Sequence, residues 1–432
     1  MRFGAKLKAP TTASRAILVL ALALTGVYAH AELRAGAITP ARVQNIIGQI
    51  QHLRALKFEY PVRIAYLNPE QVGRRIKSDT ENEKDRKTAR LNAEVGTMLG
   101  LLPKGFDPSD APASMLKLDL GGFYDLQRKD LVIVETPAAV GKRITAQQTL
   151  ETSNVVAHEL THALQDQHFA IGTRLKLAND GDDDRSLALR AVVEGDATLA
   201  AYGITAGRID NQVLDVFVQH IPDMERQFAE KTRDVPWGVR EPFIFQYMSG
   251  ARFVAEAYHR HGWNGVNALY AKPPQSTQQI LNPSLYFDSA SPPPQVHLAG
   301  YEKILSDWTK RDESPLGEFL LRIIIQSTGG HDTPLAALAD AWSGDSAVVL
   351  TKNHSTTVLW MLAFADDESA ARFVRAYSEA LDRIHGARTP HRVERNSRLV
   401  LVMVGDGAAH DRDLLPEVWR NTTVTAARSD KR

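Results

Sequence analysis

The chain has 432 residues with 51 basic and 51 acidic side chains, so its formal net charge is zero and nothing in it indicates nucleic-acid binding. It contains no cysteine, which excludes disulfides, cysteine nucleophiles and thiolate metal sites. A hydrophobic content of 44% and a charged content of 24% are ordinary for a globular protein. The length allows one large domain and a smaller one.

The first 31 residues have the pattern of a secretory signal peptide. Four Lys and Arg residues precede an apolar core over residues 16–27, and Ala29-His30-Ala31 is an A-x-A cleavage site. The apolar run is too short to span a bilayer comfortably, although an uncleaved anchor is an alternative. Cleavage after Ala31 leaves 47 basic against 51 acidic residues. We therefore expect a periplasmic or secreted protein without a stable membrane span.

Several elements are predicted before the central motif. Thr39 and Pro40 predict the start of a helix, with Thr as the N-cap and Pro at the first helical position. Residues 62–67 form a strand candidate, and residues 118–125 and 131–135 are predicted to form a hairpin. An edge strand before a metal-binding helix could align an extended peptide substrate through its backbone N–H and C=O groups. A plain structural hairpin is the alternative.

The main chemical signal is the H-E-x-x-H motif over His158, Glu159 and His162, within a helix predicted over residues 148–167. The two histidines are one helical turn apart, so their imidazoles share one face and can hold one Zn²⁺. Glu159 is placed to take a proton from a water that the metal activates. Apolar flanking residues favour a buried site over a helix with two surface histidines.

A catalytic zinc usually has three protein ligands, and two residues compete for the third position. His168 has the spacing of the metzincin motif, but that motif needs a turn-forming Gly where this chain has Gln165. Glu194 lies among apolar residues on a second predicted helix over 185–202, where a carboxylate is costly unless it is paired or binds a metal. We favour Glu194, with Asp196 as a candidate hydrogen-bond acceptor for a ligating histidine.

The sequence that flanks the motif is more specific than the motif itself. The run 158–169 (HELTHALQDQHF) is followed by Glu194-Gly195-Asp196-Ala197, by YMSG at 247–250 and by PPQSTQQIL at 273–281. These segments resemble a poorly characterised family of bacterial exported proteins with a gluzincin-type, thermolysin-like zinc site. The resemblance covers about residues 62–342. It implies a zincin fold and a zinc ligand at Glu194, but no substrate.

Residues 205–285 are predicted to be mostly helical. Gluzincins commonly use a Tyr, His or Arg to polarise the scissile carbonyl, and the sequence does not choose among its candidates. Tyr247 is our first choice because it lies in a segment that carries the family resemblance. The other candidates are Tyr258, His259, His261 and Tyr270.

The pattern changes after Trp342. Residues 347–351 and 356–364 predict a hairpin, residues 367–384 an amphipathic helix and residues 399–404 a buried strand. This predicts a small β-β-α-β unit over residues 343–432 that ends in a polar tail and has no evident catalytic cluster.

The sequence therefore predicts a predominantly helical α+β protein with a zincin-like domain over residues 32–342. We expect an exported zinc metallopeptidase that acts on peptides or proteins, with His158, His162 and Glu194 as metal ligands and Glu159 as general base. A zincin-fold binding module without catalysis, and a zinc hydrolase of a non-peptide amide or ester, are the alternatives. The oligomeric state is not specified by the sequence.

Overall fold

The structure is a computed structural model that describes residues 38–80, 83–108, 121–134, 146–178, 182–329 and 336–426. The predicted signal peptide, residues 118–120 of the predicted hairpin and Glu135 lie outside these ranges. The described part is α+β and predominantly helical, as predicted from the sequence.

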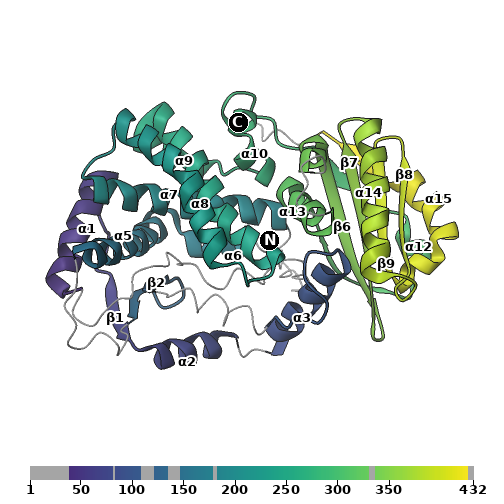
Figure 1. The fold of residues 1–432 in the computed structure, drawn as a ribbon, viewed down its shortest axis with the longest axis horizontal. Helices are drawn as coiled ribbons and strands as arrows, with labels where there is room; N and C mark the ends of the chain where they lie inside the picture. Colours follow the sequence, from purple (N-terminus) through teal and green to yellow (C-terminus); the bar gives the residue numbers. More distant parts are fainter. Residues whose placement is uncertain are drawn as a thin grey trace, which may run out of the picture.

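The N-terminal elements build one helical assembly with a small sheet (Figure 1). They are α1 (Pro40–Arg54), β1 (Arg63–Leu67), α2 (Pro69–Thr80), α3 (Glu83–Met98), β2 (Gly122–Asp125), β3 (Asp130–Val134), α5 (Ala146–Phe169), α6 (Ile171–Ala178), α7 (Asp183–Ala206), α8 (Asn211–Lys231), α9 (Trp237–Ala271), α10 (Thr277–Leu281) and α11 (Pro283–Phe287).

The remaining elements build a second, sheet-based part, at the right of Figure 1. They are β4 (Gln295–His297), α12 (Tyr301–Ile304), β5 (Thr309–Ser314), α13 (Gly317–Gly329), the 3₁₀ helix η3 (Ala336–Ala341), β6 (Trp342–Lys352), β7 (Ser355–Phe364), α14 (Asp367–His385), β8 (His391–Asn396), β9 (Leu399–Gly405), the 3₁₀ helix η4 (Asp406–His410), α15 (Asp411–Asn421) and β10 (Thr423–Thr425).

Local signals explain where α1 and α7 begin. The Thr39 side chain accepts a hydrogen bond from the backbone N–H of Arg42 at 3.2 Å, and Pro40 opens α1, as predicted. Asp182 caps α7 in the same way, through the N–H of Arg185 at 2.8 Å. Acidic residues in the first turn of α7 also suit the positive end of the helix dipole.

The predicted hairpin before the H-E-x-x-H helix is present. β2 pairs antiparallel with β3, and β1 pairs parallel with the other side of β3, which gives the order β1-β3-β2. β2 is therefore an edge strand of this sheet. Its backbone lies beside α5, the helix that carries the H-E-x-x-H motif.

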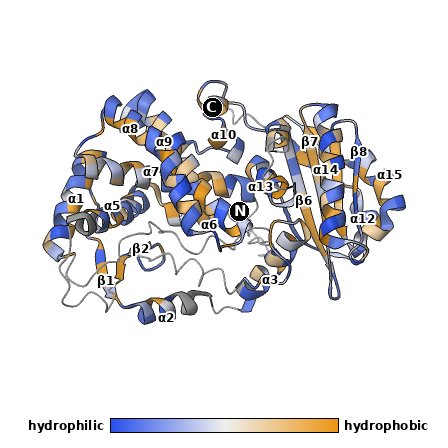
Figure 2. Ribbon diagram, viewed as in Figure 1, coloured by the Kyte–Doolittle hydropathy of each residue, from blue (hydrophilic) through white to orange (hydrophobic). Residues whose placement is uncertain are grey.

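The second part is built on a five-stranded antiparallel sheet of order β5-β6-β7-β9-β8. Side chains that alternate along β7 and β9 point to opposite faces, and both faces are covered. Val358 and Trp360 belong to the large core with α13 and α14, whereas Leu359 and Met361 pack with α12 and α15. Figure 2 shows the apolar character of β6 and β7.

This sheet is larger than the predicted β-β-α-β unit. It includes β5, which precedes the expected boundary at residue 343, and β8. Both are edge strands with few buried residues, so their sequences lack the continuous apolar runs of the inner strands.

The central helix pair α7 and α9 packs at backbone contact distance. A Cβ added at Gly195 would lie 2.3 Å from the carbonyl oxygen of Gly250, and one at Gly250 would lie 2.1 Å from the carbonyl oxygen of Ala191. Glycine is thus needed at both positions because no side chain fits between the helices. Gly195 follows Glu194 directly, so this contact also fixes the place of that carboxylate.

We expect Gly250→Ala to destabilise the fold by about 1–3 kcal/mol, because the added methyl group must push the two helices apart. The control is Gly73→Ala in α2, where a Cβ would meet nothing within 4 Å. That substitution should be neutral or stabilising, because alanine favours helix. Urea unfolding of both variants tests this, and an equally stable Gly250→Ala variant would contradict the close contact.

None of the helices in the described ranges combines the length and apolarity required to cross a membrane.

Candidate metal centre

Two helices bring three candidate metal ligands together. His158 and His162 project from one face of α5, and Glu194 projects toward them from α7. The Nε2 atoms of the two histidines are 3.0 Å apart. One carboxylate oxygen, Glu194 Oε2, lies 3.2 Å from Nε2 of His158 and 3.3 Å from Nε2 of His162. The three donor atoms therefore form a nearly equilateral triangle.

The triangle has the size that a zinc ion requires. Donors bound about 2.1 Å from one tetrahedral ion are about 3.3–3.4 Å apart, close to the separations of these three atoms. Two imidazole nitrogens and one carboxylate oxygen are also a common donor set for zinc. All three side chains are at most 3% exposed. The residues present thus fit a zinc ion.

The charges around the triangle favour a cation at its centre. Burial lowers the pKa of His158 to about 4, which leaves this imidazole neutral and able to bind metal. Burial also acts to lower the pKa of His162, but attraction to Glu194 outweighs it and raises the value to about 9. The two histidines in turn overcome the effect of burial on Glu194 and hold its pKa below the usual range. A positive charge beside Glu194 is therefore stabilised.

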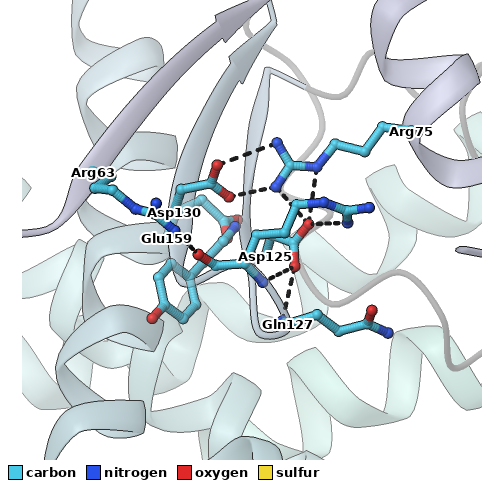
Figure 3. A network of polar contacts seen from close by, with 8 residues as sticks. Arg63, Arg75, Asp125, Gln127, Asp130 and Glu159 are labelled. Carbon is cyan, nitrogen blue, oxygen red and sulfur yellow. Dashed lines mark hydrogen bonds and ion pairs between the residues drawn. The ribbon is translucent and has the colours of Figure 1, made fainter.

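Glu159 lies next to these donors and is fully buried. It has an oxygen within 4.8 Å of the two histidine donors. Its Oε2 accepts a hydrogen bond from the backbone N–H of Tyr124 in β2 at 2.9 Å, whereas its buried Oε1 has no hydrogen-bond partner among the described residues (Figure 3). Burial raises the pKa of Glu159 to about 8. In its ionised form, this carboxylate has Oε2 held by the Tyr124 N–H and can accept a proton at Oε1.

Glu194 and Glu159 therefore differ in their suitability as a third ligand. Glu194 contacts both imidazole nitrogens through one oxygen, whereas one oxygen of Glu159 is engaged by the edge strand. Glu194 is therefore better placed than Glu159 to act as a third ligand.

His168 is not part of this cluster. α5 continues as a helix to Phe169, so a residue six positions after His162 lies on another side of the helix. The Nε2 atom of His168 lies 2.7 Å from the carbonyl oxygen of Lys57, and its Nδ1 atom is 3.9 Å from Glu59. The chain does not turn at Gln165, so the metzincin arrangement is not formed.

Gln165 and Asp196 support His162 in a way that the sequence analysis missed. Gln165 Oε1 lies 2.8 Å from Nδ1 of His162, and its Nε2 donates to Asp196 Oδ2 at 3.0 Å. Asp196 therefore reaches the histidine through Gln165 and not directly. Tyr270 and Arg54 also donate to Asp196 Oδ2, at 2.8 Å and 3.0 Å. The three-residue spacing from His162 to Gln165 was the one available signal.

Among the candidates for carbonyl polarisation, Tyr247 packs directly on one of the candidate ligands. Its ring stacks on His158 with centroids 5.7 Å apart, and the side chain is buried. The hydroxyl of Tyr270 donates to Asp196, and the hydroxyl of Tyr258 donates to the carbonyl oxygen of Ile209. His259 and His261 are exposed.

The hairpin that holds Glu159 is itself fixed by an ion-pair network (Figure 3). Arg75 from α2 donates to Asp125 through Nε at 2.9 Å and Nη2 at 2.6 Å, and it also pairs with Asp130. Burial acts to raise the pKa of Asp125, but hydrogen bonds from the Arg128 N–H and from Arg75 outweigh it and lower the value. These contacts tie both strands of the hairpin to α2.

Comparison with known proteins adds information about one part of the chain. A family model described as a domain of unknown function (DUF8575) matches residues 303–431, which contain the five-stranded sheet but none of the residues of the metal centre. Neither the curated proteins nor the solved structures include a match to the chain. The metal centre is therefore interpreted from its own geometry.

Proposed function

We propose that this protein is an exported zinc metallopeptidase with a zincin-like catalytic domain. The observation that carries the proposal is the triangle formed by Nε2 of His158, Nε2 of His162 and Oε2 of Glu194, with sides of 3.0, 3.2 and 3.3 Å. The helix-borne H-E-x-x-H motif with a glutamate from a second helix is also the gluzincin pattern that the sequence resembles.

In the proposed reaction, His158, His162 and Glu194 would hold the metal. When bound, zinc would lower the pKa of a water ligand and polarise the carbonyl group of the scissile peptide bond. Glu159 accepts the proton of the attacking water at Oε1 and passes it to the leaving amine. The Tyr124 N–H holds Oε2 and so orients the carboxylate. Tyr247, stacked on His158, is the candidate donor to the developing oxyanion.

The proposal is tested by the zinc content of purified wild-type protein and of the Glu194→Ala and His168→Ala variants, with casein cleavage assayed on the same samples. We expect near-stoichiometric zinc and chelator-sensitive cleavage in the wild type and in His168→Ala, and loss of both in Glu194→Ala. Zinc lost from His168→Ala but retained in Glu194→Ala would contradict this ligand set. A wild type that binds no zinc would overturn the proposed function.

One observation favours a second candidate, a zincin-fold binding module without turnover. The ligating side chains and Glu159 are buried, and Oε2 of Glu159 is engaged by the edge strand. If this arrangement persists in solution, substrate does not reach the site. Full zinc content without cleavage of casein or of a mixed peptide library would favour this candidate.

A further inference from the structure

A continuous chain of buried hydrogen bonds leads from the metal centre to the N-terminal helix. It begins at His162 Nδ1 and passes through Gln165 to Asp196, whose Oδ2 also accepts hydrogen bonds from Tyr270 and Arg54. Each of these residues is at most 2% exposed. Arg54 is the last residue of α1, so the chain joins α1, α5, α7 and α9.

The amide of Gln165 has a fixed orientation within this chain. Its Nε2 group donates to Asp196 Oδ2 and to the carbonyl oxygen of Val193, both at 3.0 Å. Both partners are acceptors, so the NH₂ group must face them and Oε1 must face His162. His162 therefore donates its Nδ1–H to Gln165. With Nδ1 engaged in this way, Nε2 is the ring nitrogen left to bind a metal.

This arrangement explains why residue 165 is an amide. A carboxylate would also accept from His162, but its second oxygen would face Asp196 at hydrogen-bond distance. Two buried carboxylates at that separation repel each other strongly. Only a side chain that accepts on one side and donates on the other satisfies both neighbours. Arg54 and Tyr270 also donate to Asp196.

We propose that Gln165, Asp196, Tyr270 and Arg54 form a positioning network that fixes the tautomer and orientation of His162 for metal binding. The inference rests on the proposed zinc site. The four residues do not touch the reacting atoms, so they act through His162. α1 is thereby part of the support of the metal centre, although it contributes no ligand.

The test uses Gln165→Glu in the full mature protein, with zinc affinity measured by competition with a chromophoric chelator after removal of bound metal. We expect zinc affinity to fall about 10–100-fold, because the new carboxylate repels Asp196 and displaces His162. The double variant Gln165→Glu/Asp196→Asn restores a donor opposite the carboxylate and should recover most of the lost affinity. Such a rescue is not expected if residue 165 only affects general stability.

Gln167→Glu is the matched control, since it makes the same substitution two residues later on α5. Gln167 contacts backbone groups of Glu59 and Tyr60 and not the metal-binding residues. Equal zinc affinities for Gln165→Glu and wild type, or equal losses in the two glutamate variants, would overturn the proposal. If Gln165→Glu does not fold, Tyr270→Phe removes one donor to Asp196 and should weaken zinc binding several-fold; unchanged affinity would then overturn it.

A second readout separates this proposal from the proposed function. Nitrogen-15 NMR of the metal-free protein reports directly which ring nitrogen of His162 carries a proton. A protonated Nδ1 in the wild type that loses its hydrogen bond in Gln165→Leu supports the positioning network even if the wild type binds no zinc. An Nδ1 without a proton in the wild type contradicts the network, whatever the zinc content.

Discussion

Replacement of Glu159 with Gln is expected to lower peptide hydrolysis by about 10²–10⁴-fold while zinc content stays at the wild-type level. The amide keeps an oxygen that can accept the Tyr124 N–H, so the local structure should persist. It cannot take a proton from water at neutral pH, which removes the proposed general base. The measurement is the kcat/KM for a peptide substrate together with zinc per chain.

The control for this variant is Glu151→Gln, the same substitution about two turns earlier on α5. It should leave cleavage close to the wild-type rate. A Glu159→Gln protein with wild-type activity would refute the proposed role of Glu159. A variant that loses zinc as well would show that this carboxylate also contributes to holding the metal.

Arg54→Ala should have the largest effect on stability, a loss of about 3–5 kcal/mol in the free energy of unfolding. Arg54 is 1% exposed and pairs with the fully buried Asp196 at 3.0 Å. Its guanidinium also donates to Asn267 and lies 4.1 Å from the ring centre of Trp263. Removing it leaves the Asp196 carboxylate buried without a cation, which costs far more than a lost surface contact.

Denaturant unfolding of the purified variant measures this loss. The control is Arg74→Ala on α2, where the arginine pairs with Glu70 and both side chains are largely exposed at 61% and 80%. Water and salt screen such a pair, so its removal should change stability little. Similar losses in the two variants would mean that the buried pair does not stabilise the fold in the way that its geometry indicates.

The parts of the site that the sequence could predict are those within one helix. Helical periodicity alone places His158 and His162 on one side of the helix. It also places His168 on another side, provided that the helix continues past Gln165. Glu194 could be named only from its apolar surroundings and from the family resemblance, because its distance from the histidines depends on how α5 and α7 pack. The structure supplies that packing.

Gln165 and Arg54 show why the rest could not be predicted. Gln165 was considered only as a residue that replaces a turn-forming glycine, because its function depends on Asp196, 31 residues away. Arg54 is an ordinary last residue of an amphipathic helix until α1 packs on α7 and buries it. Strands β5 and β8 were missed for a related reason, since charged edge strands carry no continuous apolar run.

The burial of the three proposed ligands affects how fast a bound metal would exchange. His158, His162 and Glu194 are carried by two long helices in the core and are at most 3% exposed. In the proposed metalloprotein, an ion would therefore enter or leave when the surrounding structure opens locally, and the rate of that opening would limit the rate of exchange. A protein loaded with a given metal when it folds would keep that metal for long periods, whichever ion binds most tightly at equilibrium.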